Sequence, residues 1–273
     1  MKPYVIIALT TLYDLNTEQF GEALYSTIGG VEPKLLPQKA GWLGRLSSDI
    51  ASAADFASLW GKDRQMYTSE RRGGKKRGTG IYCPVEWARP SAIKSKGNII
   101  HPGLKYSNQT GGMVLRSEWR ERVDWLGLFR ELCLLTKAAH GMLHIFTPEE
   151  VTQLDPREHS QYLREGFHGQ QAFTYSIDPY GIRRAPGPGD PNLLTFRQVP
   201  DLTWATWLGT NFNDQYEARG LMDIVANNTE IKDGLLFTIT DQLRDVLRDF
   251  QAFQKEREFV KERGFPKTFF PDR

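Results

Sequence analysis

The sequence predicts an α+β protein in which helices flank a mixed, largely antiparallel sheet. The first observation is the almost continuous apolar run from Tyr4 to Leu9, which is typical of a strand buried on both faces. The second is the segment from Trp119 to Leu135, where apolar side chains recur at helical spacing over one wide face. Because each of these elements needs apolar cover, we expect the helix to pack on the sheet that contains the strand.

Composition limits the classes of protein that this sequence can form. At 273 residues it lies near the upper end of what one hydrophobic core supports, so we expect one domain over 1–273. Apolar residues make up 40% and charged residues 25%, which are ordinary globular values and exclude disordered, fibrous and membrane classes. The net charge of +2, from 35 basic and 33 acidic residues, is too small to hold a polyanion, so direct nucleic-acid binding is not expected.

The N-terminus resembles a secretory signal only superficially. Lys2 precedes the apolar run, but Pro3 interrupts its start, Asp14 follows closely, and there is no small-residue cleavage site. The sequence also lacks any run of about twenty apolar residues that could span a membrane. We therefore expect a cytoplasmic protein with no membrane partner.

The first half of the sequence is expected to contain helices separated by exposed loops. Asn16 is the expected N-cap of a helix that ends near Gly29, and a second helix is expected at about 49–60. Basic residues and glycines dominate the next segment, so a loop is expected at about 62–80. A second loop, rich in Pro, Gly, Asn and Ser, is expected at about 88–112.

In the second half, Ser117 is the expected cap of the central helix, and a strand is expected from Met142 to Phe146. A concentration of prolines and glycines predicts a third long loop at about 177–200. A late strand is expected from Leu235 to Ile239, and Thr240 is the expected cap of a final amphipathic helix.

Cysteine and histidine spacing does not indicate a metal site. Cys83 and Cys133 lack the paired spacing of zinc ligands or of a disulfide framework. His140 and His144 are four positions apart, but Gly141 lies between them at the expected end of a helix, so they should not share a helical face. We expect no metal and no cofactor.

One enzyme signature remains as an alternative. Asp201, Glu230 and Lys232 are similar to the pattern of restriction-type nucleases, in which two carboxylates hold magnesium and a lysine helps to orient the attacking water. The setting argues against it, because Glu230 and Lys232 run directly into the turn at Asp233 rather than lying within a buried strand. A magnesium-dependent nuclease is the alternative function, and the favoured expectation is a protein that is not an enzyme.

The C-terminal third resembles a family of bacterial immunity proteins. The stretch Pro200-Asp201-Leu202-Thr203-Trp204-Ala205-Thr206-Trp207-Leu208-Gly209, then Asp233-Gly234-Leu235-Leu236-Phe237 and the final helix, carry the resemblance. It is to immunity proteins of polymorphic-toxin and type VI secretion systems, in the group paired with restriction-endonuclease-fold toxins. The resemblance implies an antitoxin that binds a toxic effector directly, and it makes the nuclease-like pattern accidental.

A binder needs exposed aromatic and basic anchors, which are the side chains enriched at interface hot spots. The expected loops supply such residues, and we take them as the candidate partner-binding set. Its members are Arg71, Arg72, Lys75, Arg77, Trp87, Arg89, Tyr180, Arg183 and Arg184.

Overall fold

We describe the fold from a computed structural model of the chain. The described residues are 3–11, 13–42, 45–61, 65–72, 75–82, 85–101, 111–146, 202–210, 218–231 and 233–265. Within 65–82, and at 100, 101, 111, 218 and 219, only the backbone is described.

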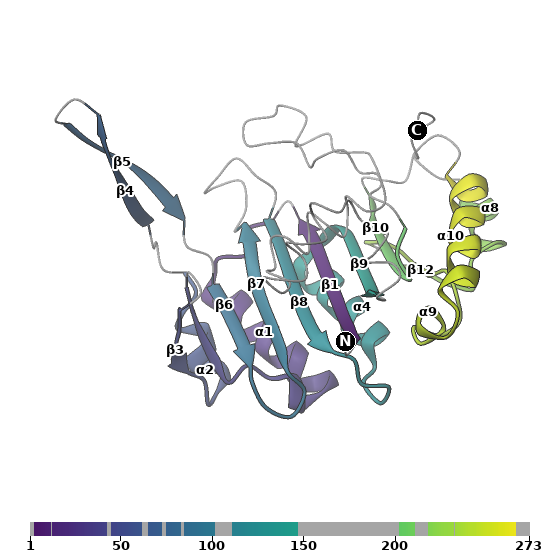
Figure 1. Cartoon of the computed structure of the whole chain (residues 1–273), viewed down its shortest axis with the longest axis horizontal. Coiled ribbons are helices and arrows are strands. Elements are labelled where there is room, and N and C mark those ends of the chain that lie inside the picture. The colour runs from purple at the N-terminus through teal and green to yellow at the C-terminus, as the bar shows by residue number, and fades with distance from the viewer. Residues whose placement is uncertain are drawn as a thin grey trace.

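Within these residues, ten strands form a single antiparallel sheet (Figure 1). The order across the sheet is β11-β12-β10-β9-β1-β8-β7-β6-β2-β3, and each neighbouring pair is antiparallel. This confirms the predicted α+β class. The strands are β1 (Tyr4–Thr11), β2 (Lys39–Trp42), β3 (Arg45–Asp49), β6 (Val85–Arg89), β7 (Ser95–His101), β8 (Gly111–Glu118), β9 (Ala138–Phe146), β10 (Ala205–Gly209), β11 (Asn227–Ile231) and β12 (Gly234–Thr238).

The central strand is β1, as its apolar sequence predicts. It pairs with β8 on one side and β9 on the other, and its residues from Val5 to Thr11 are buried. Because side chains alternate between the faces of a strand, Val5, Ile7 and Leu9 lie on one face, with Ile6 and Ala8 on the opposite face. Both faces of β1 are therefore covered, which explains why the run is apolar throughout.

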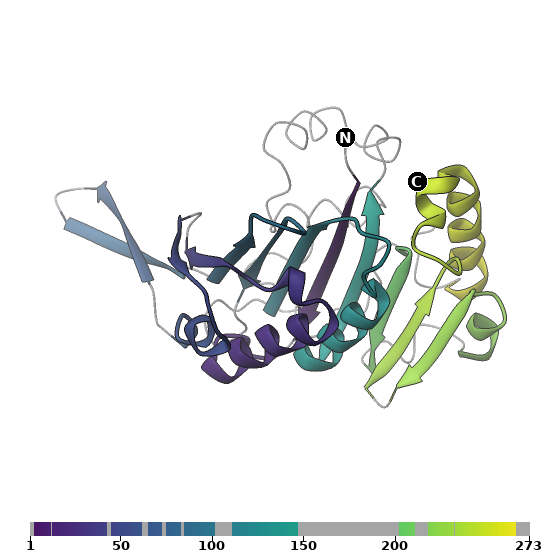
Figure 2. The same ribbon diagram turned by 90° about the horizontal axis from the view of Figure 1, so that it is seen from below.

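Helices cover one face of the sheet (Figure 2). They are α1 (Glu18–Val31), α2 (Ala53–Ala57) and α4 (Trp125–Thr136), with the 3-10 turn η1 (Pro33–Leu35) after α1. Leu24 of α1 and Leu128 of α4 are fully buried and belong to the same core cluster as Ile7 of β1. The core therefore lies between this helical layer and the sheet.

The C-terminal helix contacts the opposite face of the sheet. It is α10 (Phe250–Gly264), and it follows α8 (Ala218–Met222) and α9 (Asp245–Arg248). The ring of Phe253 on α10 lies 5.4 Å, centroid to centroid, from that of His144 on β9. His144 pairs in register with Ile6, so it lies on the face that the helical layer does not cover.

A separate hairpin projects from the body of the molecule (Figure 1). Its strands are β4 (Gln65–Arg72) and β5 (Lys75–Tyr82), which pair with each other in a two-stranded sheet of their own. The sequence predicts a loop at 62–80, and the backbone instead forms a β-ribbon. Gly73 and Gly74 stand between the strands, and two-residue glycine-rich turns are favoured in hairpins because glycine accepts positive φ.

Two expected helix starts are wrong in their details. The hydroxyl of Thr17 accepts the N-capping hydrogen bond from Phe20 N (3.1 Å), while the Asn16 side chain accepts one from Gly61 N (3.3 Å). The helix expected at 49–60 is shorter, because β3 occupies 45–49 and Ser52 caps α2. Asp49, where the expected helix begins, instead pairs with Lys39 as part of the β2–β3 ladder.

In the central region of the chain, the observed elements differ more from those expected from the sequence. Ser117 is buried in β8 and caps no helix; the Asp124 side chain instead accepts the capping hydrogen bond from Gly127 N (2.8 Å). The loop expected at 88–112 is wrong over its middle, where β7 lies between β6 and β8. Pairing on both sides holds a segment whose local composition favours a loop.

The start of the final helix also differs from the expectation. Thr240 accepts a hydrogen bond from Trp204 Nε1 (3.0 Å), and α10 begins only after Asp249, whose carboxylate accepts from Ala252 N (2.9 Å). The expected loop at 177–200 lies outside the described residues.

Candidate partner-binding surface

Four basic residues of the predicted set, Arg71, Arg72, Lys75 and Arg77, lie near the tip of the β4–β5 hairpin. The register pairs Arg72 with Lys75, Arg71 with Lys76, and Glu70 with Arg77. Five of these six residues are basic in sequence. The two strands pair with each other and with no other strand among the described residues.

Trp87 is not at the surface, which corrects its prediction as an exposed anchor. It lies in β6, it is 1% exposed, and its ring packs beside that of Phe56 at 5.8 Å between centroids. β6 runs from Val85 to Arg89, and its pairing with β7 places Trp87 on the helical side of the sheet.

Arg89 makes contacts within the protein. Its Nη1 donates to the carbonyl of Leu36 (2.9 Å) and its Nε donates to that of Ser91 (3.2 Å). These bonds fix the end of β6 against the segment after α1. The guanidinium is thus used in the fold, and the structure does not present it as an isolated loop anchor.

The remaining predicted residues lie in segments of which the structure says little. Tyr180, Arg183 and Arg184 are outside the described residues, as are Asp201 and Lys232 of the alternative nuclease signature. Glu230 is described, and it is exposed on β11, the edge strand that a short turn joins to β12. An exposed edge strand is a poor place to hold a catalytic metal, because a metal site needs several fixed ligands.

The two histidines of β9 lie on one face of the sheet, since the alternation of a strand places residues four apart on the same side. Backbone N–H of Trp204 donates to His144 Nδ1 (3.2 Å), so that nitrogen is an acceptor. Burial lowers the pKa of His140 to about 3, which keeps its imidazole neutral at physiological pH. Burial likewise raises the pKa of the Cys133 thiol well above its usual value.

No group of His, Cys, Asp and Glu residues in the described part of the chain has the arrangement of a metal site. Among the helices that the structure describes, none is both long and apolar enough to cross a membrane.

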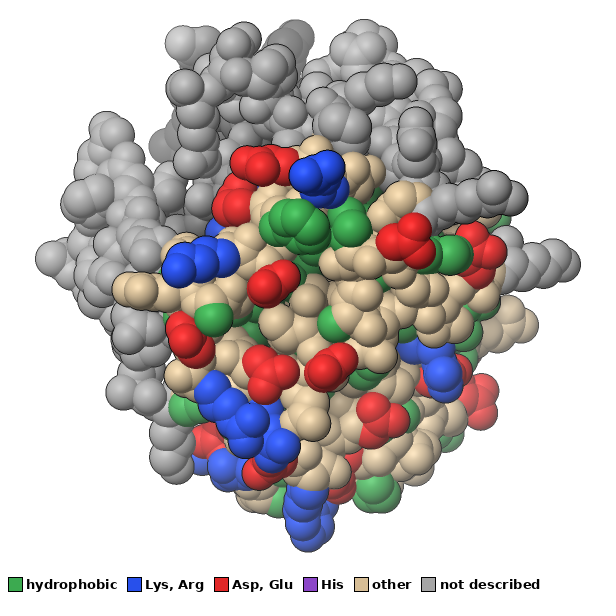
Figure 3. All heavy atoms as spheres, turned by 90° about the vertical axis from the view of Figure 1, so that its right-hand side faces the viewer, with side chains coloured by type: hydrophobic (Ala, Val, Ile, Leu, Met, Phe, Trp, Pro, Cys, Tyr) green, Lys and Arg blue, Asp and Glu red, His purple; other side chains and the backbone are tan. Residues whose placement is uncertain are grey.

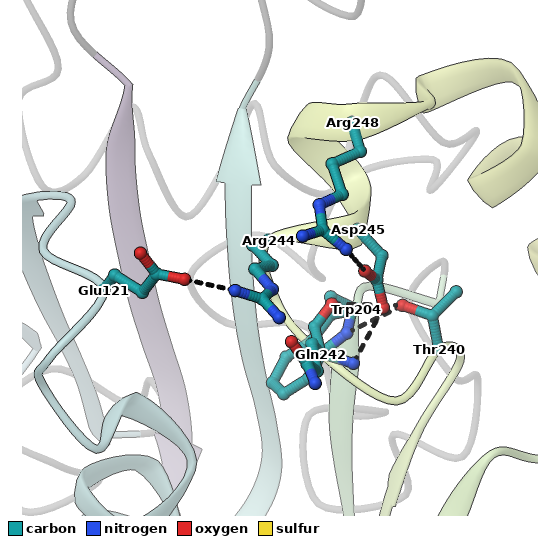
Figure 4. A network of polar contacts seen from close by, with 7 residues as sticks. All are labelled: Glu121, Trp204, Thr240, Gln242, Arg244, Asp245 and Arg248. Carbon is teal, nitrogen blue, oxygen red and sulfur yellow. Dashed lines mark hydrogen bonds and ion pairs between the residues drawn. The ribbon is translucent and has the colours of Figure 1, made fainter.

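A polar network joins the C-terminal segment to the turn after β8 (Figure 4). Arg244 donates to the carboxylate of Glu121, and Asp245 accepts a hydrogen bond from Gln242 N (2.9 Å) and lies 3.7 Å from a guanidinium nitrogen of Arg248. The groups are partly or largely exposed, so each ion pair adds little to stability. The network links Arg244, just before α9, to Glu121, just after β8.

The C-terminal elements present an acidic face (Figure 3). Among the described residues from 220 to 265, the exposed basic residues are Arg248, Lys255 and Arg263. The exposed carboxylates of the described residues from 220 to 265 outnumber them, eight to three. They are Asp223, Glu230, Asp233, Asp241, Asp249, Glu256, Glu258 and Glu262. This face repels phosphate backbones, in contrast to the basic tip of the hairpin.

Comparison with known proteins finds similarity at the level of solved structures. No protein-family model matches the sequence, and no curated protein matches it. Among solved structures, the chain is similar to the Pseudomonas aeruginosa type VI secretion system (T6SS) protein PA0821, with a TM-score of 0.48 and 11% sequence identity. The similarity covers 88% of this chain and 65% of that protein, so this chain matches less than two thirds of its length.

Proposed function

We propose that this protein is a cytoplasmic immunity protein that binds and neutralises a cognate toxic effector, a nuclease of a type VI secretion system. The observation that carries the proposal is the immunity-type sequence of 200–209 and 233–237. Ala205–Gly209 of the first stretch form β10, and the second stretch runs from Gly234 into the neighbouring strand β12, where Leu235 pairs with Leu208. Trp204 and Trp207 are 3% and 0% exposed, so these residues act as fold markers and leave binding to other surfaces.

The proposed contact is the basic tip of the β4–β5 hairpin. A magnesium-dependent nuclease presents a cleft lined with carboxylates, and Arg71, Arg72, Lys75 and Arg77 supply charge-assisted hydrogen bonds to such groups. Cations in the cleft would exclude both the metal and the nucleic-acid backbone. Neutralisation then needs stoichiometric binding and no chemical change in the toxin.

The test is co-purification of the tagged protein with the product of the adjacent gene, followed by an assay of that product's toxicity. We expect a stable complex and protection of cells that express both proteins. Replacement of the four hairpin residues by alanine should weaken the complex by at least about tenfold if they are hot spots. If no toxic protein encoded beside this gene binds the wild-type chain, the proposed function is wrong.

A further inference from the structure

The edge strand β11 has one open side. It ends the ten-stranded sheet, and among the described residues β12 is the one strand with which it pairs (Figure 2). The consecutive residues from 226 to 230 are all exposed, so neither face of the strand is covered there. An open edge is a template for another strand, because alternate backbone N–H and C=O groups point away from the sheet.

The hydrogen bonds of β12 show which backbone groups of β11 point outward. Ile239 N donates to the carbonyl of Trp204 (2.9 Å), so the backbone groups of Ile239 point toward β10. Those of the preceding residue, Thr238, therefore point toward β11, where Thr238 pairs with Asn227. Since the orientation alternates along a strand, the N–H and C=O groups of Asn228 point outward.

The sequence of β11 gives its edge little protection. Natural edge strands are commonly blocked by proline, lysine, a bulge or a covering segment. β11 contains no proline and no lysine, and its ladder with β12 has no bulge. Its one charged residue is Glu230, whose backbone groups point outward like those of Asn228. A strand that pairs with this edge must therefore avoid a negative charge opposite Glu230.

A second copy of β11 meets this requirement. When two copies pair antiparallel about a two-fold axis at Thr229, this residue faces its own copy. Asn228 then faces Glu230 of the second copy, and the outward backbone groups of these two residues meet. Threonine pairs and amide–carboxylate pairs can form hydrogen bonds across strands, and no like charges face each other. An axis one residue later, at Glu230, would instead place two carboxylates opposite each other.

We propose that β11 is the interface of a homodimer, in which two sheets join edge to edge through antiparallel β11 strands. The dimer goes beyond the proposed function and does not depend on it. Main-chain hydrogen bonds hold the pair, and the self-complementary sequence selects a second copy as the occupant. Two strands of five residues form a small interface beside the roughly 1,200 Å² or more that stable complexes bury. We therefore expect a weak dimer that forms at high protein concentration.

Cysteine cross-linking tests the register. The background is a Cys83→Ser chain, in which the remaining Cys133 is buried. Thr229→Cys should form a disulfide-linked dimer under mild oxidation, because Cα atoms in such a pair are about 4.5 Å apart, within disulfide reach. Ser47→Cys, an exposed position on the opposite edge strand β3, is the matched control and should stay mainly monomeric. Equal cross-linking at the two positions, or none at Thr229→Cys, overturns the proposal.

Sedimentation over a range of protein concentrations measures the strength of the pairing. Asn228→Glu places two pairs of carboxylates opposite each other in the dimer and should weaken it by about threefold or more. Adding Glu230→Lys should restore dimerisation, because both pairs then carry opposite charges. A thermal melt of each variant shows that it is folded. A wild-type chain that stays monomeric up to about 1 mM, or dimerisation that Asn228→Glu leaves unchanged, contradicts the proposal.

A strand of a different protein is the alternative occupant of this edge. If Asn228→Glu abolishes capture of the adjacent gene's product and leaves self-association unchanged, β11 binds that product and the homodimer is wrong. If the wild-type chain dimerises through β11 but captures no such product, the homodimer stands and the proposed function fails.

Discussion

Trp87 on β6 lies directly over Gly97 on β7, its partner across the sheet. A Cβ atom added at position 97 would lie 2.1 Å from Cζ2 of the indole, so only glycine fits beneath the ring. Trp87 cannot easily move away, because Phe56 and Trp60 pack against it with ring centroids at 5.8 and 6.4 Å. This pair joins the sheet to the helical layer.

We therefore expect Gly97→Ala to destabilise the protein by about 1–3 kcal/mol or more, because the added methyl overpacks a rigid core. Chemical denaturation followed by tryptophan fluorescence measures this. Gly30→Ala is the matched control, since Gly30 is exposed near the end of α1 and nothing lies within 4 Å of its added Cβ. That change should be neutral, or stabilising by about 0.5–1 kcal/mol from helix propensity. Equal effects at the two positions would contradict the proposed packing.

Lys96→Glu should stabilise the isolated protein slightly. It replaces a like-charge pair with Arg116 by an opposite-charge pair, and cross-strand charge pairs contribute roughly 0.2–1 kcal/mol. Urea unfolding at low and high salt measures the gain, which should shrink as salt screens it. Lys94→Glu, a change at the exposed lysine just before β7, is the control. A clear loss of stability in Lys96→Glu would mean that the fold itself requires the lysine.

The stability of the protein should fall in mild acid because of His140. Its pKa in the folded state is about 3, below the ordinary 6.5, so the neutral imidazole favours the fold above pH 6.5. That contribution is lost as the pH falls from 6.5 toward 3, because the unfolded chain takes up the proton first. The slope is about 1.4 kcal/mol per pH unit for one such group.

Denaturant unfolding at several pH values between these limits tests the expectation. The profile of His140→Gln should lack this slope, and the difference between the wild-type and variant profiles isolates the contribution of His140 from those of other groups. Identical profiles for the two proteins would show that His140 is not the titrating group.

The purified protein should not cleave DNA or RNA in the presence of magnesium. Glu230 lies exposed on an edge strand, where it has no described carboxylate cluster around it. A gel assay with both substrates tests this. Cleavage that disappears in both Asp201→Ala and Glu230→Ala would establish the nuclease alternative and contradict the binder proposal.

Local sequence was sufficient to predict several elements. The apolar run at Tyr4 identifies the central strand, because a strand covered on both faces must be apolar at every position. The helical spacing after Trp119 locates the central helix, although that helix begins later, at Trp125. In each case the determining contacts are close in sequence, or burial alone decides the pattern.

Tertiary structure alone determines the other features, which are the strand β7, the burial of Trp87 and the strand registers. β7 forms within a glycine- and proline-rich stretch because β6 and β8 pair with its two edges, and this pairing places Trp87 in the core rather than in a loop. The like-charge pair of Lys96 and Arg116 exists only through the register that aligns β7 with β8. A shift of one residue in register would move a strand's side chains to the other face, and register depends on contacts between segments far apart in sequence.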